Sequence, residues 1–354
     1  MTDQTGRLVV FIATPLEQEQ VERIEAVAPD KVEVIFEPDL LPPIRYVADH
    51  KGRSNFRWTP EQEDRWRGHL GRAEILWDFP PAASDGTPGL ELTPNLKWVQ
   101  TSSSGVGQYV KRLGIQDSDI LITTARGVHA VPLAEFVFLA LLGHVKRLPH
   151  LQAQQRAHHW ERFCSDELTG KTLAVIGTGE VGRQVAAVAP AFGMRVVALA
   201  RPGSNRTAEE LGIETLFPAE NLHDMLSEAD ALVLTVPHTP ETEGLIDEAA
   251  FAALKPGAGL INIARGQVVD HDAMIRNLLS GRLGFAALDP FAVEPLAPAS
   301  PLWDLPNVLI SPHSASTAES ENRKITDIFC HNLRCYLEGR QEDMRNILDK
   351  KRLY

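Results

Sequence analysis

The stretch "TLAVIGTGEVG", residues 172–182, constrains the fold of this chain more than any other part of the sequence. A run of apolar residues is followed by three glycines and then by helix-forming text, "RQVAAVAPAFG". This order predicts a buried strand, a tight turn and a helix. In such a unit Gly177 allows the turn, Gly179 lets the backbone approach a pyrophosphate at the positive end of the helix, and Gly182 allows close helix packing. The sequence therefore predicts a dinucleotide-binding loop formed by Gly177, Gly179, Glu180, Val181 and Gly182.

Strand-like runs continue on both sides of this loop. Downstream, "RVVALA", "ALVLTV", "GLINIA", "GFAALD" and "NVLIS" alternate with helical text, which indicates a doubly wound parallel sheet. Upstream, "RLVVFIA", "VEVIF", "AEILW" and "LKWV" are further short runs of the same kind. A chain of 354 residues exceeds the usual size of one hydrophobic core. We therefore predict an α/β protein with two domains, each built on a parallel sheet.

Three other segments have recognisable patterns. Residues 38–66 are rich in proline and charge and lack a clear period, so we predict a long loop or an insertion there. Residues 131–159 begin apolar and end polar, which predicts either one long helix or two abutting helices. Residues 318–340 place Ile325, Phe329 and Leu333 on one face, which predicts a helix near the end of the sequence.

Charge and cysteine content argue against several classes of partner. The net charge of −12 disfavours nucleic acid and anionic membranes. The three cysteines form no CxxC pair and no HExxH motif occurs, so we predict reduced thiols and no metal site. The amino terminus lacks the pattern of a signal peptide, and the most apolar run, residues 131–145, is shorter than the roughly 20 residues that a membrane span needs. These features predict a cytoplasmic protein.

The residues after "RVVALA" bear on which dinucleotide binds. A carboxylate about 20 residues beyond the glycines ordinarily holds the ribose hydroxyls of NAD. Ala200 and Arg201 occupy that place here, with Ser204 and Arg206 close behind. Such a set can hold the 2′-phosphate of NADP by charge and hydrogen bonds. The alternative is a solvated basic turn that binds nothing. We therefore expect NADP(H) to be preferred, with NAD(H) as the alternative cofactor.

Three further motifs follow in order: "NIARGQVVD", "LDPFAVEP" and "SPHSAS". They contain a cation and a titratable side chain that suit an anionic substrate. Arg265 can grip a carboxylate with its guanidinium fork, and His313 can exchange a proton with a substrate oxygen. A carboxylate such as Glu294 beside a histidine favours the imidazolium form. Taken alone, each residue is better explained in an ordinary way, as an ion-pair partner, a loop histidine or a turn residue. Their order after the glycine loop, and above all the family resemblance that the motifs show together, favours catalysis.

Together with the glycine loop, these motifs resemble the D-isomer-specific 2-hydroxyacid dehydrogenases over roughly residues 97–316. The resemblance implies a Rossmann dinucleotide-binding domain (124–311) inserted into a flavodoxin-like substrate-binding domain (1–123 and 312–354). It also implies an active site between the domains, a homodimer formed through the nucleotide domain, and a small 2-keto or 2-hydroxy acid as substrate. Pro237 and Asp289 match positions that contact the cofactor in this family.

Two stretches of the first domain are candidates for substrate binding. "TSSSGVG", residues 101–107, resembles the loop whose backbone amides bind the substrate carboxylate in this family, which selects Ser103, Ser104 and Gly105. "EILWDFPP" resembles the glyoxylate and hydroxypyruvate reductases, which place a tryptophan beside the substrate. Trp77 is therefore a further candidate, although ordinary core packing explains this residue equally well.

Two alternatives stay open. The same fold can act on phosphoglycerate, formate or phosphite. Glu294, where formate dehydrogenases of this fold usually have glutamine, argues against formate, and the chain ends about forty residues after His313, without the regulatory domain that phosphoglycerate enzymes often add. The other alternative is a non-catalytic protein that senses dinucleotides, because such proteins can keep Arg265, Glu294 and His313.

Overall fold

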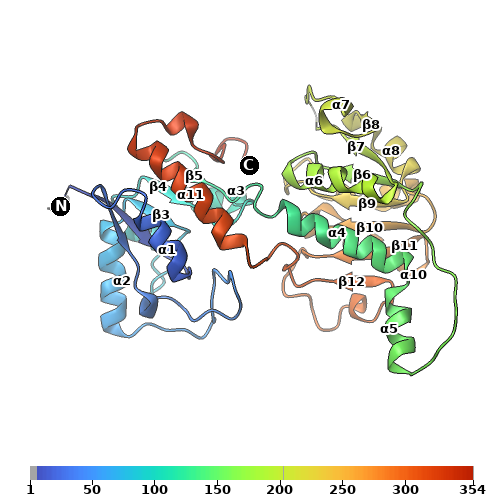
Figure 1. The fold of residues 1–354 in the computed structure, drawn as a ribbon, viewed down its shortest axis with the longest axis horizontal. Helices are drawn as coiled ribbons and strands as arrows, with labels where there is room; N and C mark the ends of the chain where they lie inside the picture. The colour runs from blue at the N-terminus through green and yellow to red at the C-terminus, as the bar shows by residue number, and fades with distance from the viewer. Residues whose placement is uncertain (1–5, 202, 354) are drawn as a thin grey trace. The chain divides into compact units, whose positions relative to one another are not determined.

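A computed structural model describes residues 6–201 and 203–353 and divides the chain into two compact units. Unit 1 comprises Met1–Val128 and Thr317–Tyr354, and unit 2 comprises His129–Ser316. Each unit is an α/β structure around one parallel sheet (Figure 1), as the alternation of apolar runs and helical text predicts. No helix in the described part of the chain is long and apolar enough to span a membrane.

Unit 1 has a five-stranded sheet in the order β2-β1-β3-β4-β5, with all strands parallel. This order is that of the flavodoxin-like fold. The strands are β1 (Leu8–Ile12), β2 (Val32–Ile35), β3 (Ile75–Trp77), β4 (Trp98–Gln100) and β5 (Leu121–Thr123), and the helices are α1 (Gln18–Glu25), α2 (Pro60–Arg72), α3 (Gly107–Arg112) and α11 (Glu321–Leu337).

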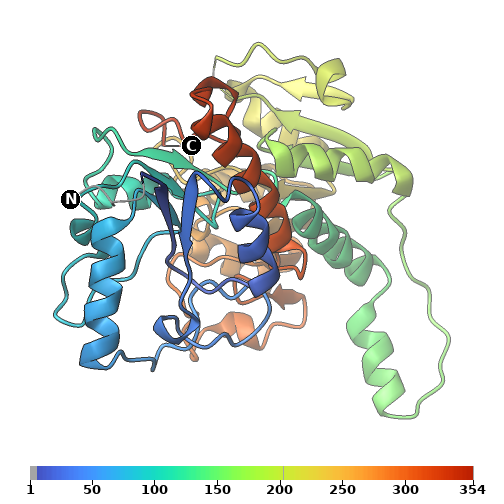
Figure 2. The same ribbon diagram turned by 60° about the vertical axis from the view of Figure 1, so that its left-hand side comes forward.

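The core of unit 1 has a layer on each face of its sheet. Because side chains alternate along a strand, Val10 and Ile12 of β1 pack with α1 and α11, whereas Val9 and Phe11 pack with α2. The ring of Trp98 stacks on Phe329 of α11, with 4.9 Å between the ring centroids. The two sequence segments of unit 1 therefore share one core, and α11 lies beside α1 in both views of the ribbon (Figures 1 and 2).

Unit 2 has a seven-stranded parallel sheet in the order β12-β11-β10-β9-β6-β7-β8. This is a doubly wound Rossmann arrangement, in which the order reverses between β6 and β9. The strands are β6 (Thr172–Ile176), β7 (Arg195–Leu199), β8 (Thr215–Phe217), β9 (Ala231–Leu234), β10 (Ala258–Asn262), β11 (Leu283–Leu288) and β12 (Val308–Ile310). The helices are α4 (Ala130–Val145), α5 (Leu148–Arg156), α6 (Glu180–Val188), α7 (Ala208–Leu211), α8 (Leu222–Glu228), α9 (Glu248–Ala253) and α10 (His271–Leu279).

The structure corrects the prediction of a long loop over residues 38–66. Helix α2 begins at Pro60, inside that segment, and is stabilised by a capping box between Thr59 and Gln62. Only Trp66 and Leu70 of this helix are buried, so its sequence carries too few apolar residues for a helical period to show. The predicted helical segment 131–159 is two helices, separated at Arg147, which has a left-handed backbone with φ 53°.

The six predicted strands of unit 2 are confirmed, and the structure adds a seventh, β8. Strand β8 was not predicted because its three residues lie at the edge of the sheet, where their side chains are only partly buried and leave no apolar run in the sequence. Since all strands of this sheet are parallel, their carboxyl ends lie along one edge. That edge is followed in the sequence by the predicted site residues: Gly177 after β6, Arg201 after β7, Pro237 after β9, Arg265 after β10, Asp289 after β11 and His313 after β12.

Candidate active site

The glycine loop joins β6 to α6 at the point where the strand order reverses. A side chain at Gly182 would place its Cβ 1.9 Å from the carbonyl oxygen of Gly177, so only glycine allows this contact between helix and strand. Gly177 has φ 108°, and a Cβ there would meet Thr235 at 2.5 Å. At Gly179, the N-cap of α6, a Cβ would meet nothing within 4 Å. The backbone at Gly179 is therefore open to a ligand at the positive end of the helix.

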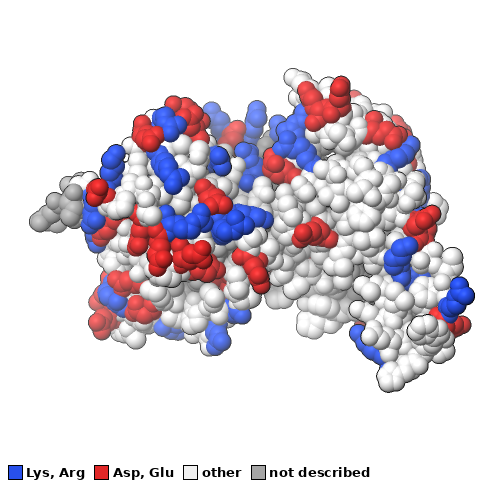
Figure 3. All heavy atoms as spheres, viewed as in Figure 1, with Lys and Arg blue, Asp and Glu red and all other residues white. Residues whose placement is uncertain are grey.

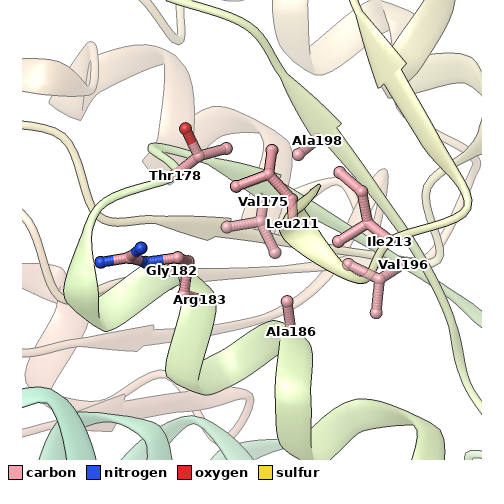
Figure 4. A pocket seen from close by; sticks show the side chains of 9 residues that line it. All are labelled: Val175, Thr178, Gly182, Arg183, Ala186, Val196, Ala198, Leu211 and Ile213. Carbon is pink, nitrogen blue, oxygen red and sulfur yellow. The ribbon is translucent and has the colours of Figure 1, made fainter. Parts of the chain in front are cut away.

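A small apolar pocket lies beside this loop, between α6 and the sheet (Figure 4). Its walls are mainly aliphatic, from Val175, Val196 and Ile213 among others, and the guanidinium of Arg183 points away from them. The pocket encloses about 10 Å³, room for about one water molecule. A nucleotide does not fit there, so the open side of Gly179 is the better candidate for the pyrophosphate.

The basic loop after β7 lies against the glycine loop. The guanidinium of Arg206 donates a hydrogen bond to the carbonyl oxygen of Thr178, with a distance of 2.7 Å between nitrogen and oxygen. The hydroxyl of Ser204 accepts from the backbone amide of Arg206 at 3.3 Å, and the amide of Ser204 donates to the carbonyl of Arg201 at 2.9 Å. Arg201, Ser204 and Arg206 thus share one turn, and Arg206 joins that turn to the glycine loop.

A turn after β10 carries Arg265. The buried side chain of Asn262 forms this turn, because its amide donates to the carbonyl of Arg265 and its oxygen accepts from the backbone of Ala264, both at 3.0 Å. Burial lowers the pKa of the Arg265 guanidinium, while the negative charges of Glu294 and Asp289 oppose that shift. The group nevertheless remains a cation at neutral pH, because an arginine is protonated throughout the physiological range.

The turn that carries Arg265 packs against the loop that carries Glu294. A Cβ at Gly266 would lie 2.0 Å from the backbone nitrogen of Ala292, which shows how closely the two segments approach. The side-chain amide of Gln267 also donates to the carbonyl of Ala292 at 3.2 Å. The guanidinium of Arg265 and the carboxylate of Glu294 are therefore both held at the same edge of the sheet.

His313 and Glu294 form a direct pair. The Nδ1 atom of His313 lies 3.0 and 3.1 Å from the two carboxylate oxygens of Glu294, and both side chains are partly exposed. One of these oxygens also accepts from the backbone amide of Phe291 at 2.9 Å. The pairing occupies Nδ1, so the second ring nitrogen, Nε2, is the one available for proton exchange.

Asp289 holds the segment that carries His313. Its buried carboxylate accepts from the hydroxyl of Ser311 at 2.6 Å and from the backbone amide of Ala315 at 2.9 Å. Its carbonyl oxygen accepts from the amide of His313 at 3.1 Å. His313 has a left-handed backbone, with φ 55°, inside this bonded segment. These contacts give Asp289 a positioning role, and a contact between Asp289 and a cofactor remains a prediction, as does one for the exposed Pro237.

The candidate substrate loop lies in unit 1, after β4. Ser103, Ser104 and Gly105 are exposed, and their backbone amides donate no hydrogen bond to any described residue. The hydroxyl of Thr101 donates to the carbonyl of Ser103 at 2.7 Å and fixes the turn. Three neighbouring amides without protein acceptors can bind an anion, because backbone N–H groups need hydrogen-bond acceptors.

Trp77 does not suit the substrate contact predicted for it. It is 1% exposed, and its ring packs edge-on against Phe329 in the core of unit 1, with 5.7 Å between centroids. The indole therefore has no surface to offer a ligand in this structure. Core packing, the alternative interpretation of this residue, fits the geometry.

Comparison with known proteins identifies the family. The family model described as "D-isomer specific 2-hydroxyacid dehydrogenase, NAD binding domain" matches residues 138–315. A glyoxylate reductase from Aeropyrum pernix is 34% identical over 264 residues, which cover 71% of this chain and 76% of that protein. The chain belongs to the family of D-isomer-specific 2-hydroxyacid dehydrogenases. The resemblance stated from the motifs is thereby confirmed.

Other members of the family cover different lengths. A D-3-phosphoglycerate dehydrogenase from Mycobacterium tuberculosis H37Rv is 40% identical over 317 residues, which are 84% of this chain but only 57% of that protein. This chain therefore spans little more than half the length of that relative. The solved NADPH-dependent glyoxylate/hydroxypyruvate reductase of Sinorhizobium meliloti, in complex with NADP and sulfate, superposes with a TM-score of 0.76. It is 26% identical, and the match covers 98% of this chain and all of that one.

Several residues that shape the candidate site were not predicted from the sequence. Asn262 and Ser311 are buried and make the turns that present Arg265 and His313. A polar residue at the very end of an apolar strand run was the available signal, because a buried polar group needs a local partner. Asp78, which directly follows β3, carries the same signal and was not singled out.

Proposed function

We propose that the chain is an NAD(P)-dependent D-2-hydroxyacid dehydrogenase that works as a 2-keto acid reductase and prefers NADP(H). The observation that carries this proposal is the Glu294–His313 pair, at the same edge of the sheet as the glycine loop and Arg265. The proton donor His313, the carboxylate-binding Arg265 and the dinucleotide loop then each follow a strand of the same sheet. A histidine–glutamate pair with only a structural role would not require a glycine loop and an arginine at the same edge.

The glycine loop fits a dinucleotide. Gly177 and Gly182 are required by packing inside the protein, whereas the space at Gly179 is open, so its lack of a side chain serves something outside the fold. When bound there, the cofactor supplies the hydride for the substrate carbonyl carbon. The residues that would hold it are the glycine loop for the pyrophosphate and Arg201, Ser204 and Arg206 for the phosphate on the ribose.

The side chains of unit 2 divide the remaining work. Arg265 binds the substrate carboxylate through its fork of N–H donors and draws electron density from the adjacent carbonyl. As negative charge develops on the carbonyl oxygen, Nε2 of His313 donates the proton. Glu294 accepts the hydrogen bond from Nδ1, which fixes the ring orientation and stabilises the imidazolium before transfer. In the oxidative direction the neutral Nε2 accepts the proton of the substrate hydroxyl.

The amides of Ser103, Ser104 and Gly105 form a second group that we assign to the substrate carboxylate. Their exposure and lack of protein acceptors support this assignment. The experiment that tests the proposed function is a panel of glyoxylate, hydroxypyruvate, pyruvate, phenylpyruvate and branched 2-keto acids, followed by NADPH oxidation. We expect turnover of at least one small 2-keto acid. Cofactor binding without turnover of any of them favours the dinucleotide-sensing alternative instead.

Replacing Arg201 by alanine should narrow the preference for NADPH. The change removes a guanidinium from the turn that joins the glycine loop, and hydrogen bonds to charged groups contribute about 1.5–3 kcal/mol. We expect the KM for NADPH to rise roughly 10- to 100-fold while the KM for NADH changes little. Steady-state kinetics with both cofactors measure the ratio.

Arg195→Ala is the matched control for this experiment. Arg195 begins the same strand, β7, at the opposite edge, where it pairs with Glu214 and Glu228. This variant should keep the wild-type ratio of the two KM values. A wild-type enzyme that prefers NADH, or an unchanged ratio in the Arg201 variant, would show that the loop is only a solvated basic turn.

We also propose a homodimer formed through unit 2. Helix α5 has no buried residue, and together with residues 157–168 it extends from the rest of the unit (Figures 1 and 2). Trp160 on this arm (residues 148–168) is 95% exposed. The exposed stripe of α4 carries Val131 and Leu139 on either side of Glu135, and Figure 3 shows few other charged side chains around it. A second copy of the chain would remove this apolar surface from water.

Replacing Leu151 by glutamate should convert the dimer to a monomer. Leu151 is 43% exposed on α5, so the substitution disturbs no core contact but places a charge in the proposed interface. Light scattering after size-exclusion chromatography measures the mass. The control is Leu279→Glu, at the end of α10, where the leucine is 64% exposed. If Leu151→Glu, Leu279→Glu and the wild type have equal masses, α5 is not part of a dimer interface.

A further inference from the structure

Asp78 is the first residue after β3 and has a left-handed backbone, with φ 62°. In the strand order β2-β1-β3-β4-β5, the winding of the chain reverses at β1 and β3. Ligands of doubly wound sheets bind outside the carboxyl ends of the strands at such a reversal. A non-glycine residue with positive φ is uncommon and is found often at functional positions, although aspartate tolerates it better than most residues. Asp78 therefore lies where a ligand of unit 1 is expected.

The carboxylate of Asp78 joins the candidate substrate loop. One of its oxygens accepts a hydrogen bond from the hydroxyl of Ser102, the residue just before Ser103 and Ser104. The other oxygen accepts from the backbone amide of Phe79 at 2.8 Å. An ionised carboxylate has about four acceptor positions, so these two bonds leave about two for a ligand. The side chain is partly exposed, which keeps those positions accessible.

The segments around this loop contain acidic residues but no basic ones. Residues 77–89 and 101–109, the segments that follow β3 and β4, contain no lysine or arginine. The other carboxylate of these segments, Asp85, is bonded to Arg67 and to the amide of Thr87, so its charge is already compensated. Among the described residues, no cation pairs with Asp78. The loop thus offers amides to one anionic group and an uncompensated carboxylate next to them.

We propose that Asp78 determines substrate specificity, favouring 2-keto acids with a hydroxyl at C3 and excluding those with a phosphate at C3. This inference rests on the proposed function and on the assignment of residues 103–105 to the substrate carboxylate. A C3 hydroxyl can donate to a free acceptor position of Asp78. A C3 phosphate brings a second anion to a loop without a cation, where like charges repel. The 3-phosphoglycerate substrate of the longer relatives is disfavoured on this ground.

The experiment compares kcat/KM for hydroxypyruvate, pyruvate and phosphohydroxypyruvate in the wild type, Asp78→Asn and Asp78→Gly. Asparagine and glycine both tolerate positive φ, so neither variant strains the turn. The hydroxypyruvate-to-pyruvate ratio should fall about 10- to 100-fold in Asp78→Gly, which removes the acceptor. The phosphohydroxypyruvate-to-hydroxypyruvate ratio should rise at least about tenfold in Asp78→Asn, which removes only the charge. Asp85→Asn is the control and should leave both ratios unchanged.

The outcomes separate this inference from the proposed function. Unchanged ratios in both Asp78 variants, with activity retained, overturn the role of Asp78 and leave the reductase proposal standing. A uniform fall in kcat/KM for all three substrates shows that Asp78 only stabilises the turn with Ser102, and it overturns the specificity role as well. No turnover of any of the three by the wild type, in protein that binds NADPH, contradicts the proposed function and with it this inference.

Discussion

Replacing His313 by alanine should lower kcat for 2-keto acid reduction by about 10²- to 10⁴-fold, the usual contribution of a general acid. The imidazole is the group paired with Glu294, and its removal leaves the carbonyl oxygen without a positioned proton donor. The glycine loop lies after a different strand, β6, so the affinity for NADPH should stay within about twofold of the wild type. Stopped-flow reduction and fluorescence titration with NADPH measure the two quantities separately.

Two further variants test the His313 prediction. The first is His313→Asn, because asparagine adopts the positive φ of this position readily. A similar loss of rate in His313→Ala and His313→Asn therefore excludes backbone strain as the cause. His159→Ala is the matched control, because His159 also pairs with a glutamate, Glu161, but does so on the exposed arm. It should reduce 2-keto acids at the wild-type rate. Normal turnover by both His313 variants would remove this residue from its proposed role.

Replacing Arg265 by glutamine should lower kcat/KM by roughly 30- to 3,000-fold. The loss of one partner from a partly buried charge pair costs about 2–5 kcal/mol, and each 1.4 kcal/mol is a factor of ten. We expect both a higher KM and a lower kcat, since Arg265 is proposed to bind the carboxylate and to polarise the carbonyl. The kcat/KM of Arg265→Lys should lie between those of the wild type and Arg265→Gln, because lysine keeps the charge but cannot bind a carboxylate with two parallel hydrogen bonds.

Arg276→Gln is the control for the Arg265 series. Arg276 lies on α10 of the same unit, is 60% exposed and pairs with Glu248, so its loss should leave kcat/KM unchanged. Thermal unfolding of all variants shows whether a loss of rate follows from a loss of structure. Substrate kinetics close to the wild type in Arg265→Gln would show that Arg265 does not bind the substrate carboxylate and would require another cation for that role.

The sequence is most informative about unit 2. A parallel sheet buried on both faces shows as runs such as "TLAVIG" and "GLINIA", and the residues that follow those runs lie at one edge by topology alone. Gly177, Arg265 and His313 were therefore predictable as a group before any geometry. Edge strand β8 was not, because partial burial removes the apolar signal.

Other features depend on contacts between distant residues, which a single sequence does not encode locally. Nothing in "EILW" indicates that Trp77 packs against Phe329 of α11, which is far away in the sequence, and is therefore buried. The bond from Ser102 to Asp78 likewise joins the ends of two neighbouring strands. Helix α2, which begins inside the segment 38–66, could not be predicted from a helical period. It is stabilised by the burial of only two residues in the core rather than by a continuous apolar stripe.

Unit 1 is formed by two separate segments of the chain, and this affects the order in which the two units fold during synthesis. Residue Ile347 bridges Thr123, and the amide of Leu348 donates to Ile122 at 2.8 Å, so β5 gains backbone partners from the last part of the chain. Helix α11 also supplies Phe329 to the core of this unit. During synthesis the whole of unit 2 leaves the ribosome before these groups exist. We therefore expect unit 2 to fold first, while the apolar face of unit 1 that later receives α11 is still exposed to water.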